Sequence, residues 1–280
     1  MREKPGSDFV PAAPIPAATV ILVRDAADGV EVFLMERSGF GVFGGLHVFP
    51  GGKIDPTDGD ALWTGLAEGV DPSTANATLG VDAGGLDYWV ACIRECFEEA
   101  GVLLATREDG TLLPLTDPVR RARFATWRER LNGGEKGAFE AMCQAEGLRL
   151  AADRLAYVSH WITPIEQPKR FNTRFFVARA PAEQEALHDG FETVESHWIR
   201  PEVALDRWQQ GELNLISPTF TNLEALTGFD TTQAVLEAKR AVDPATIPVI
   251  LPKVTPREGG DFDEEIAVVG QGGRVFDDAG

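Results

Sequence analysis

Three glutamates and an arginine lie close together on a segment with helical periodicity. Glu95, Glu98 and Glu99 are spaced i, i+3 and i+4, so a helix projects all three carboxylates from one face. Like charges at this distance repel, which raises their pKa values unless cations intervene. Arg94 can pair with part of the cluster, and such hard oxygen ligands suit Mg²⁺ or Mn²⁺. The pattern indicates a divalent-metal site; the alternative is a solvated helix face with ordinary ion pairs.

The segment upstream of this helix favours the metal site over the solvated face. Residues 51–58 read Gly-Gly-Lys-Ile-Asp-Pro-Thr-Asp, which is a glycine turn leaving a short strand, followed by two acids. A glycine turn allows the backbone to come close to a neighbouring element, and its carbonyl groups are further hard oxygen donors. Together with the helix carboxylates, the turn makes a half-cage for a cation.

These two segments resemble the signature of the Nudix hydrolase family, G-x5-E-x7-R-E-U-x-E-E-x-G-U, where U is aliphatic. Cys96 stands at the first U, and every fixed position of the second half is matched, by Arg94, Glu95, Glu98, Glu99, Gly101 and Val102. The first half matches from Gly52, with Asp58 in place of the family's glutamate. Because 35 residues separate Asp58 from Arg94, this alignment implies a 28-residue insertion. Gly80 also lies at the ungapped distance, but Leu86 would then occupy the acid position.

Further segments are similar to the branch of the family that contains coenzyme A diphosphatases. The resemblance covers about residues 17–252 and includes Arg37-Ser38, the FPGG at 49–52, and the segments 161–164, 170–176 and 247–251. It implies metal-dependent hydrolysis of a diphosphate in coenzyme A or acyl-coenzyme A. The other substrates that the resemblance allows are a dinucleotide, a nucleotide sugar or a nucleoside triphosphate. A catalytically silent nucleotide-binding domain is the remaining alternative.

The resemblance also implies roles for individual residues. Glu95, Glu98 and Glu99 are the expected ligands of Mg²⁺ or Mn²⁺, with the carbonyl of Gly52, while Arg94 orients a glutamate. The general base stays open between a glutamate of the motif, such as Glu98, and a loop acid, Glu192 or Glu195, with Glu192 preferred. The candidates for phosphate binding are Arg37, Arg170 and Arg174, since guanidinium groups bind phosphate in bidentate fashion.

The elements that must position these residues follow from periodicity and turn signals. An apolar stripe at spacings of three and four predicts a central helix over 87–100, with Asp87 as N-cap and Gly101 as terminator. Strands are expected at 19–23, 30–37, 46–49, 155–162, 174–178 and 196–199, and further helices at 117–131, 135–146, 201–210, 218–226 and 232–241. The fold class is therefore α+β, and the resemblance implies a Nudix-type α/β/α sandwich with a mixed sheet and helical insertions.

The expected organisation is one elaborated domain. Residues 1–16 read as a flexible leader, 17–252 as the Nudix domain, and 253–280 as a poorly packed acidic tail. The Gly- and Asp-rich stretch 59–86 is predicted to be a surface insertion and 105–152 a second, helical one, and both are expected to flank or cap the cleft.

Charge and cysteine usage restrict partners and compartment. The 280-residue chain carries 44 acidic and 26 basic side chains, a net charge of −18, which opposes binding to nucleic acid or to an anionic membrane. Three cysteines form no disulfide framework, and no apolar run reaches the length of a membrane helix. We expect a soluble cytoplasmic protein that acts on a small nucleotide. The sequence leaves its oligomeric state open.

Overall fold

The structure is a computed structural model that describes residues 10–38, 45–187, 193–256 and 262–275. The helices are α1 (Trp63–Leu66), α2 (Pro72–Leu79), α3 (Gly85–Ala100), α4 (Pro118–Asn132), α5 (Ala138–Glu146), α6 (Pro201–Gln209), α7 (Ser217–Glu224) and α8 (Thr232–Arg240). The strands are β1 (Ile15–Ala26), β2 (Gly29–Arg37), β3 (His47–Val48), β4 (Gly51–Lys53), β5 (Ala105–Thr106), β6 (Arg149–Leu150), β7 (Ala156–Ile162), β8 (Phe171–Arg179), β9 (Thr193–Ile199), β10 (Pro248–Ile250), β11 (Lys253–Pro256), β12 (Phe262–Glu265), β13 (Val268–Gln271) and β14 (Arg274–Val275). Within the described ranges, no helix has both the length and the apolar character to cross a lipid bilayer.

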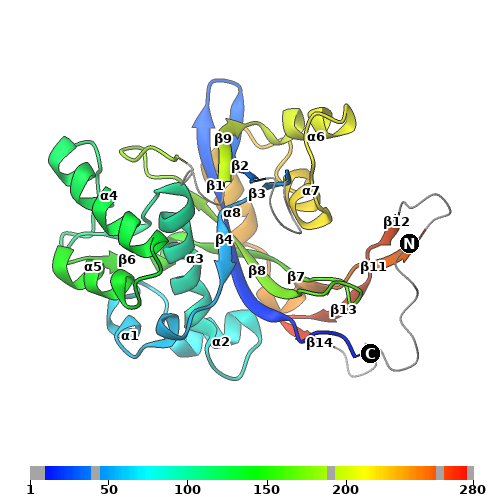
Figure 1. Ribbon diagram of the computed structural model, residues 1–280, viewed down its shortest axis with the longest axis horizontal. Helices are drawn as coiled ribbons and strands as arrows, with labels where there is room; N and C mark the ends of the chain where they lie inside the picture. The colour runs from blue at the N-terminus through cyan, green and yellow to red at the C-terminus, as the bar shows by residue number, and fades with distance from the viewer. Residues whose placement is uncertain (1–9, 39–44, 188–192, 257–261, 276–280) are drawn as a thin grey trace.

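A mixed sheet forms the centre of the molecule (Figure 1). Its main path runs β14-β13-β10-β7-β8-β1-β2-β3, while β4 pairs with β1 and β9 pairs with β2. β1 is parallel to β8 and antiparallel to β2, the strand that follows it in the sequence. The glycine strand β4 is therefore hydrogen-bonded to the long strand β1, and this pairing fixes where the glycine turn lies.

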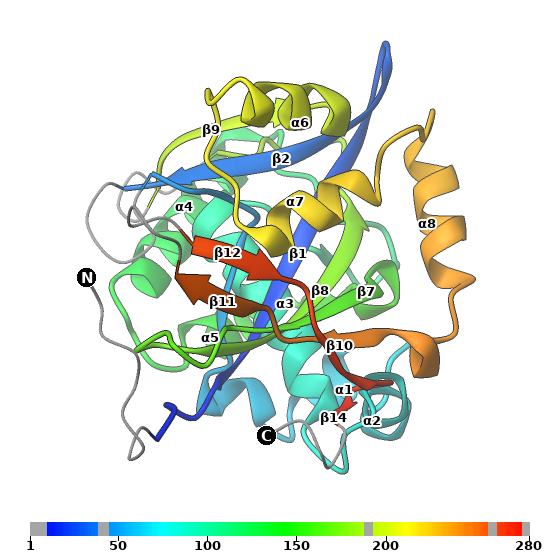
Figure 2. The ribbon, with the colours of Figure 1, turned by 90° about the vertical axis from the view of Figure 1, so that its right-hand side faces the viewer.

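Helices cover both faces of this sheet. One hydrophobic core joins α3 and its neighbours α1, α2, α4 and α5 to one face, and a second core joins α6, α7 and α8 to the other. Figure 2 shows α6 and α7 on the side facing the viewer, with the β11–β12 hairpin beside them. The predicted α/β/α sandwich with a mixed sheet is thus confirmed.

Helix α3 follows the predicted stripe, but it begins earlier than expected. Val90, Ile93 and Phe97 are almost wholly buried against the sheet. The helix starts at Gly85, whose amide donates a 2.8 Å hydrogen bond to the Asn76 side chain of α2. Asp87 therefore lies inside the first turn and is not the N-cap, because a residue from another helix satisfies the free amide. At the other end, Gly101 terminates the helix with φ of 68°, as predicted.

The stretch 59–86 lies largely at the surface, but it forms α1 and α2 and is anchored in the core by a few apolar side chains. Trp63 of α1 is 1% exposed, and its ring lies 5.4 Å from that of Phe139. Ala75 and Leu79 of α2 are fully buried in the core beneath α3. The frequent Gly, Asp and Pro residues indicated the surface position of this stretch, whereas its few apolar side chains are what fix it to the core.

Part of the predicted tail is also folded. β13 pairs antiparallel with β10 and extends the central sheet, and Val269 is buried beside Val249. At the other terminus, residues 10–14 precede β1, and the carbonyl of Ala12 accepts a 2.8 Å hydrogen bond from Arg170. The folded unit therefore extends beyond residue 252. The composition of the tail did not predict this, because strand pairing is a nonlocal contact that a polar, charged composition does not reveal.

Candidate active site

The last two turns of α3 lie against the glycine strand β4. The amide of Gly51 donates a 2.8 Å hydrogen bond to the carboxylate of Glu99. A Cβ atom on Gly52 would lie 2.6 Å from the carboxylate carbon of Glu95, closer than side-chain atoms approach one another. A Cβ atom at position 52 would therefore push the Glu95 carboxylate out of this position, which a bare backbone leaves open.

Arg94 is the centre of a buried ion network. Its Nε and Nη2 each donate a 2.9 Å hydrogen bond to the carboxylate of Asp58, and its Nη1 donates to Glu95 at 2.8 Å. Nη2 also donates to the carbonyl of Lys53 at 3.0 Å, while Glu98 lies 3.4 Å from Nη1. The contact between Arg94 and Asp58 agrees with the alignment that starts at Gly52, although 35 residues separate the two side chains in the sequence.

The protonation states within this network follow from burial and charge. Burial alone would lower the pKa of Arg94, but the hydrogen bonds and negative charges of Asp58 and Glu95 outweigh it and raise that pKa. Arg94 is therefore a permanent cation. Burial raises the pKa values of Asp58 and Glu95, and hydrogen bonding by Arg94 opposes this rise. A further cation beside Glu95 would also oppose it.

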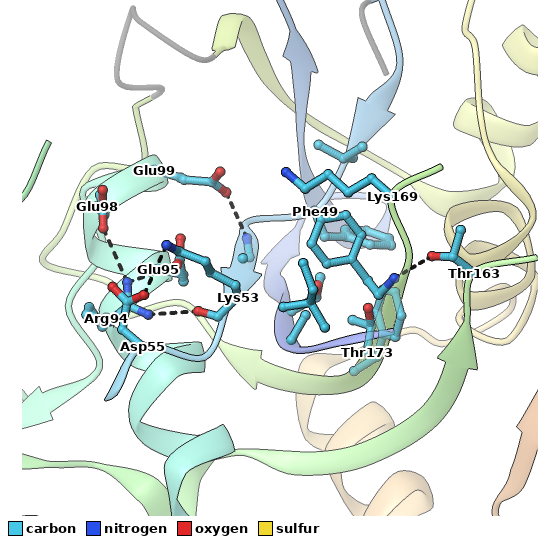
Figure 3. A pocket seen from close by; sticks show the side chains of 18 of the residues that line it. Phe49, Lys53, Asp55, Arg94, Glu95, Glu98, Glu99, Thr163, Lys169 and Thr173 are labelled. Atoms are coloured by element: carbon cyan, nitrogen blue, oxygen red, sulfur yellow. Dashed lines mark hydrogen bonds and ion pairs between the residues drawn. The ribbon is translucent and has the colours of Figure 1, made fainter. Parts of the chain in front are cut away.

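A cavity of about 1050 Å³ opens in front of the acidic turn. Figure 3 shows Glu95, Glu98 and Glu99 on one side of it, with Phe49 and Lys169 on the other. The wall combines four features: carboxylates, aromatic rings, glycines and basic groups. Its aromatic residues are Phe49, Phe139, Trp161, Phe171 and Phe175, and its basic residues are Arg37, Lys53, Arg94, Lys136 and Lys169.

The sequence interpretation missed Lys136 and Lys169. Lys136 follows α4 on the loop to α5, and Lys169 precedes β8; both side chains are exposed at the cavity wall. Lys169 lies over the ring of Phe171 at 5.1 Å. The sequence offers one hint of their role, which is that basic residues are scarce in this acidic chain. Scarcity alone does not show that a given lysine lies at the cavity. By contrast Lys53, which was recognised in the glycine turn, pairs with Asp55 at 3.3 Å.

The two predicted insertions differ in their relation to the cavity. The second one contributes Leu131 and residues 134–140, which span the loop between α4 and α5 and the first turn of α5. The first one, 59–86, contributes no lining residue among those described, because its helices pack beneath α3. The expectation that both insertions flank the cleft is therefore met by the second one alone.

Of the three predicted phosphate-binding arginines, Arg37 lines the cavity and the other two do not. Alternation along β8 turns Phe171, Thr173 and Phe175 toward the cavity. Arg174 faces the opposite side, where it is 2% exposed and lies 5.2 Å from the Tyr88 ring. Arg170 is also buried and donates to the carbonyls of Thr163 and Ala12. These two arginines make structural contacts in place of the predicted phosphate clamp.

Of the two candidate loop acids, Glu195 belongs to the described part of the chain. Glu192 lies outside the described residues. Glu195 of β9 lines a second, smaller cavity of about 320 Å³ together with Glu36, His47 and His197. In that cavity the two imidazole rings are 5.7 Å apart.

The residues at the acidic turn fit a hard divalent cation by their chemistry. Glu95, Glu98 and Glu99 offer carboxylate oxygens on one wall, and the backbone of Gly52 lies beside Glu95. As arranged in the described ranges, no three acidic, imidazole or thiol side chains already converge as a set of ligands. In this arrangement Arg94 engages Glu95, and the amide of Gly51 engages Glu99.

A sandwich of this topology with an acidic helix facing a glycine turn defines a Nudix-type fold. The model of the NUDT19 Nudix domain matches residues 71–226, which is more than half of the chain. The chain therefore belongs to the Nudix hydrolase family, in the group that this domain represents, and the resemblance stated from the motif is confirmed.

Individual relatives agree with this assignment. The chain is 27% identical over 233 residues to acyl-coenzyme A diphosphatase NUDT19 of Homo sapiens, covering 72% of this chain and 62% of that protein. It is 26% identical to the same protein of Gallus gallus, over 71% of this chain and 61% of that one. The chain thus spans about three fifths of these relatives' length. Among solved structures, a NUDIX hydrolase from Alicyclobacillus acidocaldarius is 26% identical with a TM-score of 0.65, over 80% of this chain and 96% of that one.

Proposed function

We propose that this protein is a metal-dependent diphosphatase that cleaves the diphosphate bond of coenzyme A or of acyl-coenzyme A. One observation carries the proposal: a carboxylate-rich helix turn, organised around Arg94, forms one wall of a large cavity whose other walls carry lysines and aromatic rings. Cleavage of such a substrate separates an adenosine 3′,5′-bisphosphate from a phosphopantetheine group. The names of the NUDT19 relatives support this substrate class.

Mg²⁺ or Mn²⁺ would be held by Glu95, Glu98 and Glu99 with the carbonyl of Gly52. When bound, such an ion neutralises diphosphate charge and lowers the pKa of a bound water. The chain's own contribution is to hold the ligands in place. Arg94 donates a hydrogen bond to the carboxylate of Glu95, and the amide of Gly51 donates one to that of Glu99, so both side chains are held in place. The side chain of Glu98 is 28% exposed, against 12% for Glu95, so Glu98 is the more accessible of these two.

The general base of the reaction remains a choice between two glutamates. Glu98 is favoured by its position at the cavity wall. Glu192 is the alternative that the family resemblance suggests. A base must come within hydrogen-bonding distance of the attacking water in the substrate complex, so the choice depends on a bound substrate.

The cavity wall suggests how the substrate is oriented. Lys136, Lys169 and Arg37 are the basic groups placed to bind phosphate, and the aromatic rings of Phe49 and Phe171 are placed to contact adenine or the pantetheine chain. A volume of about 1050 Å³ lies at the upper end of ordinary ligand sites, which suits a substrate as large as coenzyme A. The same site accommodates a dinucleotide, a nucleotide sugar or a nucleoside triphosphate, and these are the alternative substrates. We also propose a cytoplasmic location, with neither nucleic acid nor membrane as a partner.

A substrate panel tests this proposal. Purified protein is incubated with coenzyme A, acetyl-coenzyme A, NADH, a nucleotide sugar and a nucleoside triphosphate, each with Mg²⁺ or Mn²⁺. We expect the highest kcat/KM for a coenzyme A derivative. A dinucleotide that exceeds it by about tenfold, equal to about 1.4 kcal/mol of transition-state binding, contradicts the substrate class. Retention of ligand without turnover in millimolar Mn²⁺ favours the silent binding domain.

The variant Glu98→Gln tests the metal-binding role. It keeps the side-chain shape but removes one negative charge, so we expect a loss of kcat of at least about 100-fold. Mn²⁺ should raise the melting temperature of the wild type more than that of the variant, because the ion binds only the folded site. Glu129→Gln, at an exposed glutamate of α4, is the matched control. Activity within about threefold of wild type at saturating metal excludes Glu98 as a ligand.

A further inference from the structure

Arg128 of α4 joins the second insertion to the end of the acidic helix. Its Nε donates to the carbonyl of Glu98 at 2.8 Å, and its Nη2 donates to the carbonyl of Glu99 at 2.7 Å. Nη2 also donates to the carbonyl of Leu187 at 2.9 Å, and the amide of Leu187 donates to Ala100 at 2.9 Å. Three consecutive carbonyls at the end of α3 are therefore bonded by groups outside the helix.

This contact satisfies two needs of the helix terminus. The last four carbonyls of a helix lack partners within it, and this end also carries the negative pole of the helix dipole. Here the pole lies beside three carboxylates, so a guanidinium group adds positive charge where negative charge accumulates. Gly101 makes room for it, because a Cβ there would lie 2.9 Å from Nη1 of Arg128.

The same two residues present their carboxylates on the cavity side. Glu98 and Glu99 both line the cavity, while their carbonyls are held by Arg128. The contact of Glu98 with Arg94 is 3.4 Å long, against 2.8 Å for the Nε of Arg128 with the carbonyl of Glu98. The contact with Arg94 holds the side chain of Glu98, whereas the shorter contact with Arg128 holds its main chain.

We propose that Arg128 is a positioning residue for the metal site: it fixes the main chain of Glu98 and Glu99 so that their carboxylates meet the ion together. The insertion that carries Arg128 thereby braces the metal end of the site in addition to lining the cavity. This inference rests on the proposed function of these glutamates as metal ligands. It goes beyond the family signature, which contains no residue of this insertion.

The test compares Arg128→Met with Arg123→Met. Arg123 lies on the same helix and pairs with Glu146 at 2.8 Å, so its variant makes the same change of charge without touching α3. Mn²⁺ binding is measured directly by calorimetry, separately from turnover. Groups that orient metal ligands typically contribute 10–100-fold to affinity or activity, so we expect Arg128→Met to bind Mn²⁺ at least about 10-fold more weakly. We expect Arg123→Met to stay within about twofold of wild type.

Steady-state kinetics add a second readout. At a fixed, subsaturating Mn²⁺ concentration, kcat of Arg128→Met should fall while KM for coenzyme A changes by less than about threefold, because the substrate walls are untouched. Arg128→Lys should be intermediate, since an ammonium group keeps the charge but lacks the planar fork that reaches several carbonyls.

The outcomes separate this inference from the proposed function. If folded Arg128→Met binds Mn²⁺ as tightly as Arg123→Met, the positioning role is wrong. If Arg128→Met does not fold, Arg128→Lys decides in the same way: affinity equal to that of wild type overturns the role, and weaker affinity supports it. A wild type that binds Mn²⁺ but hydrolyses none of the diphosphates contradicts the proposed function, while the Mn²⁺ comparison still decides on Arg128. A wild type without Mn²⁺ affinity overturns both.

Discussion

Arg94 and Arg174, two of the arginines that are buried in the described part of the chain, have opposite surroundings. Arg94 of α3 donates to Asp58 and Glu95, and a third carboxylate, that of Glu98, lies 3.4 Å away. Arg174 of β8 has no carboxylate within ion-pair distance in the described part of the chain. Its Nη1 donates to the side chain of Asn172 and lies beside His160. The guanidinium of Arg94 thus lies beside three carboxylates, whereas that of Arg174 lies beside none among the described residues.

The difference reflects what each charge does. Arg94 gathers acids from α3 and from the turn after β4, so it joins the parts of the sequence motif in space. Arg174 lies on the far side of β8 from the cavity, against the ring of Tyr88. Burial lowers the pKa of Arg174, whereas the carboxylates raise that of Arg94. A buried arginine is therefore no evidence of a functional site until its partners and its side of the sheet are known.

The largest effect is expected from Arg94→Met. The change leaves Asp58, whose side chain is 1% exposed, and Glu95 as buried carboxylates without their cation. Removing one partner of a buried pair costs about 3–5 kcal/mol, so the free energy of unfolding should fall by that amount. Chemical denaturation measures it. Arg24→Met, which breaks the exposed pair of Arg24 with Glu31, is the control and should cost less than about 1 kcal/mol. A loss of less than about 1 kcal/mol for Arg94→Met would show that the network does not stabilise the fold.

The difference between the two arginines also marks the reach of sequence analysis. The carboxylates of Glu95, Glu98 and Glu99 lie on one wall because helix geometry converts spacing directly into direction. The motif placed Asp58 at its acid position in spite of the inserted residues, and the structure brings that side chain to Arg94. These contacts are predictable because each depends on local geometry or on a fixed pattern.

The residues that escaped prediction depend on nonlocal contacts. Which side of β8 Arg174 occupies is set by its register with β1 and β7, and a one-residue slip would exchange the two sides. Lys136 reaches the cavity, and Arg128 the end of α3, through the packing of a long insertion. β13 joins the sheet by pairing with β10, although its neighbourhood is rich in glycine and acids. Sequence spacing carries no record of such packing.

A smaller effect is expected from pH at His160, the neighbour of Arg174. Burial and the positive charge of Arg174 lower the pKa of His160 from 6.5 to about 3. The unfolded chain therefore takes up the proton first as pH falls, and stability is lost between pH 6.5 and pH 3. At pH 5 the loss from this one group is about 2 kcal/mol. In His160→Gln, the drop in unfolding free energy from pH 7 to pH 5 should be smaller by that amount. An unchanged pH dependence would mean that His160 is not neutral in the folded protein.

The smallest effect is expected from Arg174→Met, and it is the sharpest contrast with Arg94→Met. The substitution removes the hydrogen bond to Asn172 and the contact with Tyr88. It also removes a buried charge that has no counter-ion, and an Nε that has no hydrogen-bond partner, among the described residues. Loss of polar contacts and relief of desolvation oppose each other, so stability should change by less than about 1 kcal/mol. Because Arg174 does not line the cavity, kcat/KM should stay within about twofold. A stability loss above about 2 kcal/mol would mean that the fold depends on this charge. A large rise in KM with unchanged kcat would mean that Arg174 contributes to substrate binding.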